Sequence, residues 1–266
     1  MKTNPLKFEK TVKLGVNVKR VLLWACLILA SPLVHAETLT VAVAANVKYA
    51  FDDLAAEFKK ETGVEAKGVF GSSGKITAQI KNGAPFDVFI SADMEFPQAL
   101  YQDKLATTAP RIYANGVLVL WTLNPLDLGK GMQVLVDPAV QKIAVANPKL
   151  APYGREAIRA LEYFKLRASV EQKLIYGESI AQVNQYIDAK AVEIGFTAKS
   201  VVLAPEVNGK GKWIEVPKES YEPIAQSVVI LKHGSETHAE SAKKFLDFLF
   251  SHKGRTIFEK YGYVLP

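Results

Sequence analysis

Cysteine is almost missing from this sequence, because the single Cys26 lies in a basic and apolar N-terminal segment. Six Lys or Arg residues precede position 21, an apolar run covers 21–30, and Val34-His35-Ala36 follows. A basic start, a short apolar core and small residues before a cleavage point are typical of a secretory signal peptide. We therefore predict that residues 1–36 are removed by cleavage after Ala36. Residues 37–266 then contain no disulfide, no reactive thiolate and no cysteine metal ligand.

Long apolar runs and a large net charge are missing as well. The run 21–30 is shorter than the roughly 20 apolar residues of a membrane-spanning helix. The formal charge of +6 is concentrated in the predicted signal peptide, whose six basic residues and one acid account for +5. Residues 37–266 are thus nearly neutral, which removes the case for a nucleic-acid or anionic-membrane partner.

The remaining sequence alternates between strand and helix patterns. Apolar strand patterns followed by turns and helices occur twice, first at 38–45, 64–70 and 86–90, and again at 143–146, 174–176 and 193–197. This alternation indicates an α/β architecture with mostly parallel strands, and two similar halves imply two lobes. We expect lobe 1 to comprise 37–117 plus 231–266 and lobe 2 to comprise 118–230, with hinge strands near 118–122 and 225–230.

Four turns stand where a strand ends and a helix begins: Ala45-Asn46, Ser72-Ser73-Gly74, Tyr153-Gly154 and Ser179-Ile180. Ligands of open α/β sheets lie at the carboxyl ends of the strands. The first N–H groups of a helix lack intrahelical partners and carry the positive end of its dipole. The helical pattern points Lys75 outward, so these turns offer neutral donors. They suit a small, fully ionised oxyanion that only accepts hydrogen bonds.

A site made only of donors also discriminates among oxyanions. A protonated oxyanion would bury an O–H group without an acceptor, which costs about 1–3 kcal/mol. Phosphate carries such a proton near neutral pH, whereas sulfate, molybdate and tungstate do not. Cavity size would then separate sulfate from the other two, because metal–oxygen bonds are longer than sulfur–oxygen bonds.

Seven motifs occur in order along the chain: Ala44-Ala45-Asn46, Phe70-Gly71-Ser72-Ser73-Gly74, the segment 84–93, Asn147-Pro148, Ala151-Pro152-Tyr153-Gly154, Gly177-Glu178-Ser179-Ile180 and Tyr261-Gly262-Tyr263. With these motifs, residues 37–266 resemble the periplasmic molybdate-binding proteins of ABC uptake systems. The resemblance implies a two-lobed class II periplasmic binding protein fold, in which each lobe is a mostly parallel sheet flanked by helices. It also implies high-affinity binding of molybdate or tungstate in the periplasm and delivery to a permease in the inner membrane. No enzymatic activity and no cofactor are expected, and the protein is expected to be a monomer.

The same resemblance places the oxyanion ligands on Asn46, Ser73, Tyr153 and the backbone N–H of Ile180. Ala45 and Ser72 are second choices beside them. Molybdenum would be held through its oxygens, so no side chain is expected to ligate a metal ion directly. Many family members carry Ser where Asn46 stands and Tyr where Ala198 stands, so Tyr153 is expected to supply the hydroxyl here.

Other functions fit the sequence less well. A sulfate or other oxyanion carrier is the main alternative, whereas ferric carriers use paired tyrosines and carboxylates that this pattern lacks. Ser72 and Lys75 match the Ser-x-x-Lys signature of acyl enzymes, but no Lys-Thr-Gly sequence follows them. His233, His238 and His252 are expected to be surface residues, because their spacing indicates no metal site. Asp87 is expected to bond to backbone and Asp93 to cap a turn or helix.

Overall fold

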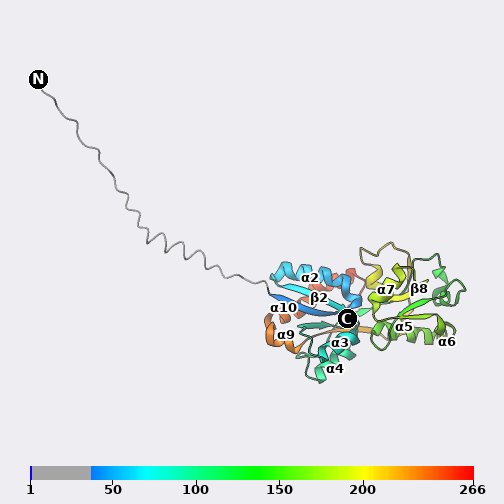
Figure 1. Cartoon of the computed structure of the whole chain (residues 1–266), viewed down its shortest axis with the longest axis horizontal. Helices are drawn as coiled ribbons and strands as arrows, with labels where there is room; N and C mark the ends of the chain where they lie inside the picture. The colour runs from blue at the N-terminus through cyan, green and yellow to red at the C-terminus, as the bar shows by residue number, and fades with distance from the viewer. Residues whose placement is uncertain (2–36) are drawn as a thin grey trace. The chain divides into compact units, whose positions relative to one another are not determined.

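The structure is a computed structural model that describes Met1 and residues 37–266. The predicted signal peptide lies outside the described residues apart from Met1, so its cleavage remains a prediction. Residues 37–266 fall within one compact unit built from two five-stranded sheets and the helices around them (Figure 1). Within this part of the chain, no helix combines the length and the apolar character needed to cross a membrane.

The first sheet has the strand order β2-β1-β3-β10-β4. Its strands are β1 (Thr38–Ala44), β2 (Glu65–Gly71), β3 (Val88–Ile90), β4 (Arg111–Gly116) and β10 (Ile224–Ile230). β1 pairs in parallel with β2 and β3, and β10 runs antiparallel to β3 and β4. β3 is buried throughout, as its continuous apolar run Val-Phe-Ile requires for a strand in the middle of a covered sheet.

The second sheet repeats this plan with the order β7-β6-β8-β5-β9. Its strands are β5 (Leu118–Thr122), β6 (Ile143–Ala146), β7 (Leu174–Gly177), β8 (Ile194–Ala198) and β9 (Lys212–Glu215). β6 pairs in parallel with β7 and β8, and β5 runs antiparallel to β8 and β9. Two mixed sheets with the same internal order confirm the predicted α/β fold with two similar halves.

Helices follow the parallel strands in both halves. The longer helices are α2 (Lys48–Thr62), α3 (Ser73–Lys81), α4 (Glu95–Gln102), α5 (Pro152–Tyr163), α7 (Ile180–Asp188), α10 (Ala239–Leu249) and α11 (His252–Lys260). The other helical segments are η1 (Ala45–Val47), η2 (Leu128–Val136), α6 (Arg167–Val170), η3 (Glu171–Lys173), α8 (Lys199–Val202), η4 (Lys218–Ser220) and α9 (Lys232–Thr237). α2 is an example of how the sequence sets these helices. One apolar face of α2 is buried, and Gly63 ends the helix in a left-handed conformation with φ of 75°.

The C-terminal helices pack on the first half, as the sequence analysis expected. The Phe58 ring of α2 lies 5.0 Å from the Phe245 ring of α10, centroid to centroid. The Tyr113 ring of β4 stacks on Phe258 of α11 at 4.8 Å. Aromatic side chains therefore join the end of the described chain to the sheet formed by its beginning.

The chain passes between the two sheets twice. The first passage lies between β4 and β5, at Val117, beside the segment 118–122 where a hinge strand was expected. The expected second passage at 225–230 is wrong. β10 pairs along its length with β3 and β4, so it belongs to the first sheet, and the passage lies between β9 and β10. A long apolar strand is stabilised in the interior of a sheet rather than in an exposed connection.

Candidate functional site

The four turns singled out in the sequence meet at one cavity. All six candidate ligand residues line it: Ala45, Asn46, Ser72, Ser73, Tyr153 and Ile180. The cavity is small, since the space open to the centre of a water-sized sphere is about 10 Å³. That space is of the order needed by one water. None of the described residues that line it carries a charged side chain.

Each turn is placed by the carboxyl end of a strand. Asn46 lies in η1 directly after β1, and Ser73 begins α3 after β2. In the second half, Ile180 begins α7 after β7, while Tyr153 lies in the first turn of α5 behind a proline at the helix start. Proline suits that position because the first N–H groups of a helix have no intrahelical partner. The first N–H groups of these helices therefore have no intrahelical partner, and in α3 the Gly74 and Lys75 N–H groups are bonded to Leu150 and Ser72.

The hydroxyl oxygens of Ser72 and Ser73 each accept a hydrogen bond from a backbone N–H group. The Ser73 Oγ accepts a hydrogen bond from the Ala92 N–H at 3.0 Å, and the Ser72 Oγ caps α3 by accepting from the Lys75 N–H at 3.4 Å. Both serines are buried, with 1 % and 3 % of their surface exposed. Each hydroxyl oxygen accepts one bond from the backbone and keeps its own O–H, which it can donate to a ligand.

Gln226 of β10 organises a buried polar network behind the cavity. Its Oε1 accepts from the Asn46 Nδ2 at 2.8 Å and from the Tyr113 hydroxyl at 2.7 Å, and its Nε2 donates to the Tyr153 hydroxyl at 3.0 Å. Burial raises the pKa of Tyr153 well above its usual value, so the phenol keeps its proton. Tyr153 therefore accepts from Gln226 and retains an O–H that can donate.

The side chain of Asn46 is used inside the protein. Its Nδ2 donates to Gln226 and also to the Tyr263 hydroxyl at 3.2 Å, which occupies both amide hydrogens. The Tyr263 hydroxyl in turn donates to the Asn46 carbonyl at 2.9 Å. The group that Asn46 can present to the cavity is thus its backbone N–H in η1, and the amide positions that turn.

Contacts join the two halves across the cavity. The Gly74 N–H donates to the Leu150 carbonyl at 2.9 Å, and the Ser200 hydroxyl donates to the Asn46 carbonyl at 2.7 Å. At the rim, the Lys75 ammonium pairs with Glu178 at 2.9 Å. A side chain at position 74 would meet the Leu150 backbone at 3.0 Å, so glycine permits this close approach. The two halves are therefore closed over the site.

Lys75 points away from the cavity, as predicted, and this geometry bears on the acyl-enzyme alternative. A Ser-x-x-Lys enzyme needs the lysine amine within hydrogen-bond reach of the serine hydroxyl. The Lys75 Nζ instead lies 2.9–3.0 Å from the two Glu178 carboxylate oxygens, and Ser72 acts as a helix cap. The geometry therefore gives Ser72 no base.

Sequence reasoning missed two residues that complete the site. Ala92 supplies the N–H that orients Ser73, and it follows the buried strand β3, where the rule of carboxyl strand ends could have found it. Gln226 is fully buried beside Ser227 in β10, and an amide within a mostly apolar strand was the available signal.

Three expectations about other polar residues have mixed outcomes. Asp87 accepts from the Thr40 N–H at 2.7 Å, which confirms its bond to backbone. Asp93 accepts from the Phe96 N–H at 3.3 Å and so bonds to the first turn of α4, although the N-cap residue of that helix is Met94. His233 and His238 are partly exposed, as expected of residues near the surface, but both also contact the buried Asp87 carboxylate at 2.9 Å.

Comparison with known proteins gives a consistent family. The model of the family described as bacterial extracellular solute-binding protein matches residues 39–264. The molybdate-binding protein ModA of Azotobacter vinelandii is 38% identical over 87% of this chain and 91% of its own length. ModA of Rhodobacter capsulatus is 36% identical over 97% of this chain and 98% of its own.

A solved structure supports the same relationship. The periplasmic molybdate-binding protein of Azotobacter vinelandii superimposes with a TM-score of 0.80 at 33% identity, covering 86% of this chain and 99% of that one. Its class II periplasmic binding protein fold matches the two mixed sheets described above. The chain therefore belongs to the bacterial extracellular solute-binding protein family.

Proposed function

We propose that this protein binds molybdate, and tungstate with it, in the cavity where the four turns meet. The observation that carries the proposal is the convergence of helix N-termini and serine hydroxyls from both halves on one small space lined by uncharged residues. The relatives that match nearly the whole chain are named for molybdate binding, which supports the same ligand class. Sulfate is the less supported alternative.

Neutral donors are chemically suited to such a dianion. Each N–H or O–H places a positive hydrogen toward an anion oxygen, and hydrogen bonds to charged groups contribute about 1.5–3 kcal/mol each. The hydroxyl groups of Ser72, Ser73 and Tyr153 all have an oxygen occupied by a protein donor. Each of these hydroxyls therefore still has its O–H to donate to an anion oxygen.

The proposed ligand set combines side chains and backbone. Ser73 donates through its hydroxyl, and Asn46 and Ile180 donate through their backbone N–H groups. Tyr153 donates from the start of α5, where its hydroxyl and its N–H are both candidates. Ala45 and Ser72 remain second choices that line the same cavity.

Transport follows from closure of the two halves. We propose that the open protein separates at the passages near Val117 and between β9 and β10, and that it closes when the anion bridges the turns. In this proposal the closed protein works as a monomer in the periplasm and is recognised by the permease of an ABC importer. The family consists of solute-binding proteins, in agreement with the expectation that the chain is not an enzyme.

Thermal shift and isothermal titration test the ligand. The protein is titrated with molybdate, tungstate, sulfate, phosphate and ferric citrate. We expect molybdate and tungstate to raise the unfolding temperature and bind with one anion per chain, because ligand that binds only the folded state stabilises it. Stabilisation by sulfate with no response to molybdate would overturn the proposal.

A further inference from the structure

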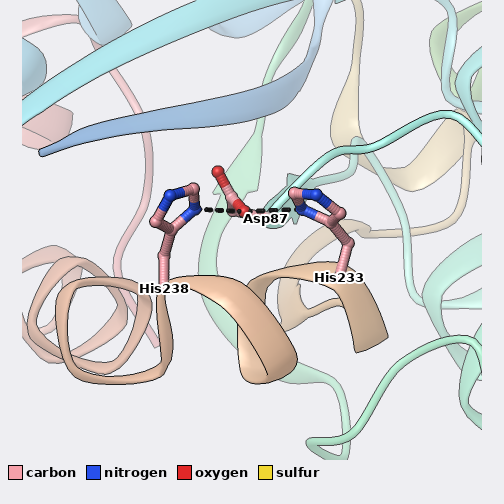
Figure 2. Close-up of side chains that lie close together, drawn as sticks. All are labelled: Asp87, His233 and His238. Carbon is pink, nitrogen blue, oxygen red and sulfur yellow. Dashed lines mark hydrogen bonds and ion pairs between the residues drawn. The ribbon is translucent and has the colours of Figure 1, made fainter.

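A second cluster of ligand-type side chains lies away from the oxyanion cavity. Asp87, His233 and His238 bring one carboxylate oxygen and two ring nitrogens within 4.8 Å of one another. The Nδ1 atoms of both histidines lie 2.9 Å from the same oxygen, Asp87 Oδ1. Figure 2 shows the two rings on either side of Asp87, with dashed lines from both to the same oxygen; His233 lies in α9 and His238 directly after it. We infer that these three residues bind a divalent transition-metal ion, with zinc as the ion that suits them best.

The donor set has the chemistry of a zinc site. Zinc binds imidazole nitrogen and carboxylate oxygen, and two histidines with one carboxylate leave a fourth position for water or an external ligand. Magnesium and calcium prefer all-oxygen sites, so two imidazoles select against them. A tetrahedral ion with bonds of about 2.0–2.1 Å places its ligand atoms about 3.3 Å apart. The three ligand atoms lie within 4.8 Å of one another, so ion binding draws them together to that spacing, and each neutral ring then carries its hydrogen on Nε2.

The carboxylate is fixed before any ion arrives. Asp87 is 1 % exposed, and its second oxygen, Oδ2, accepts from the Thr40 N–H at 2.7 Å. Such a contact orients a metal ligand and leaves Oδ1 directed at the histidines. A carboxylate held in this way loses little freedom when an ion binds.

The helix that carries the histidines is also fixed against Asp87. The Leu231 N–H donates to the Asp87 carbonyl at 2.9 Å. A side chain at Gly234 would come within 2.3 Å of that carbonyl oxygen, so only glycine lets α9 approach so closely. His233 lies in the first turn of α9 and His238 directly after its end, so one short helix presents both rings to one carboxylate.

An ion and its fourth ligand have access from outside. The side chains of His233 and His238 are 37% and 25% exposed. His233 also lines a surface cavity of about 260 Å³, together with Phe86 and Leu231. The cluster thus combines a buried, oriented carboxylate with imidazoles that reach solvent.

The cluster is separate from the oxyanion site. Asp87 precedes β3, whereas Ala92, which lines the oxyanion cavity, follows it. The three residues of β3 alone span about 10 Å. Substitution of the histidines therefore leaves the oxyanion ligands in place, and the two sites are tested independently.

Isothermal titration with zinc chloride tests the inference. The protein carries no histidine tag, the buffer contains no chelator, and magnesium chloride serves as the comparison ion. We expect one zinc per chain and no heat from magnesium. H233Q and H238Q should each weaken zinc binding by more than the roughly 10- to 100-fold that loss of an outer-shell partner costs. H252Q is the matched control, because His252 is exposed and outside the cluster.

Further measurements separate metal binding from folding. Circular dichroism and molybdate titration of each variant should match the parent, since the histidines do not touch the oxyanion cavity. Cobalt(II), which substitutes for zinc, should give a visible absorption band that is lost in H238Q. Absence of zinc binding by the parent, or an H233Q/H238Q double variant with the parent's affinity, would overturn the inference. An equal loss in H252Q would also overturn it, because it would indicate nonspecific surface binding.

Discussion

Replacement of Ser73 by alanine separates ligand binding from folding at the centre of the proposed site. The parent hydroxyl accepts from the Ala92 N–H and, in our proposal, donates to the anion. Loss of one hydrogen bond to a charged ligand costs about 1.5–3 kcal/mol. We therefore expect S73A to bind molybdate roughly 10- to 150-fold more weakly, measured by isothermal titration.

The same change leaves a buried Ala92 N–H without its acceptor. That loss costs about 1–3 kcal/mol of stability, or a decrease of about 2–12 °C in the unfolding temperature for a chain of this size. S241A is the matched control, because the buried Ser241 hydroxyl also makes one hydrogen bond, to Glu37, away from the cavity. S241A should lose stability and keep the parent's affinity. A folded S73A protein with the parent's affinity for molybdate would refute the ligand assignment.

Three further changes test the surroundings of the site. N46A should weaken molybdate binding and also lower the unfolding temperature, because the amide makes two buried hydrogen bonds; binding loss without destabilisation would show instead that the amide contacts the ligand. G74A should weaken molybdate binding about tenfold or more, because the added methyl group would crowd the Leu150 backbone at 3.0 Å when the two halves close. If G74A keeps the parent's affinity and its radius of gyration by small-angle X-ray scattering, the closed bound state is contradicted. Burial raises the pKa of Asp93, so the ionised carboxyl costs stability at neutral pH and this cost is relieved as the pH falls through the raised pKa. The free energy of unfolding of D93N and of the parent is therefore measured at pH 7 and at pH 4. We expect the parent to gain stability relative to D93N at pH 4, and a relative gain by D93N would contradict the burial argument.

Local patterns carried most of the prediction of the fold. Apolar runs and the residues that follow them located the parallel strands and the four turns, because strand burial and helix initiation depend on neighbouring residues. The position of β10 was predicted wrongly. Its run Ile224–Ile230 identifies a strand correctly, but strand pairing joins residues far apart in the chain, and no local signal states which sheet receives it.

The residues of the candidate site that stand in turns or carry hydroxyl groups could be predicted from the sequence. The residues that reach the site through contacts between distant parts of the chain could not. Ser73 and Tyr153 stand in recognisable turns, whereas Gln226 reaches Asn46 across 180 residues. The proposed metal cluster also depends on long-range contacts, since Asp87 is 146 residues from His233 and 151 residues from His238 along the chain. Histidine spacing alone therefore indicated no site, and only the folded chain brings the third ligand beside them.

The polar network behind the cavity depends on residues that lie far along the chain from Asn46. Tyr263 holds the Asn46 carbonyl through its hydroxyl, and Val264 exchanges two backbone hydrogen bonds with Asn115. Asn46 lies more than two hundred positions before these residues, so it leaves the ribosome or an export channel earlier than they do. A partly emerged polypeptide therefore lacks the contacts that set the first turn, and capture of an anion has to wait until residue 263 is in place.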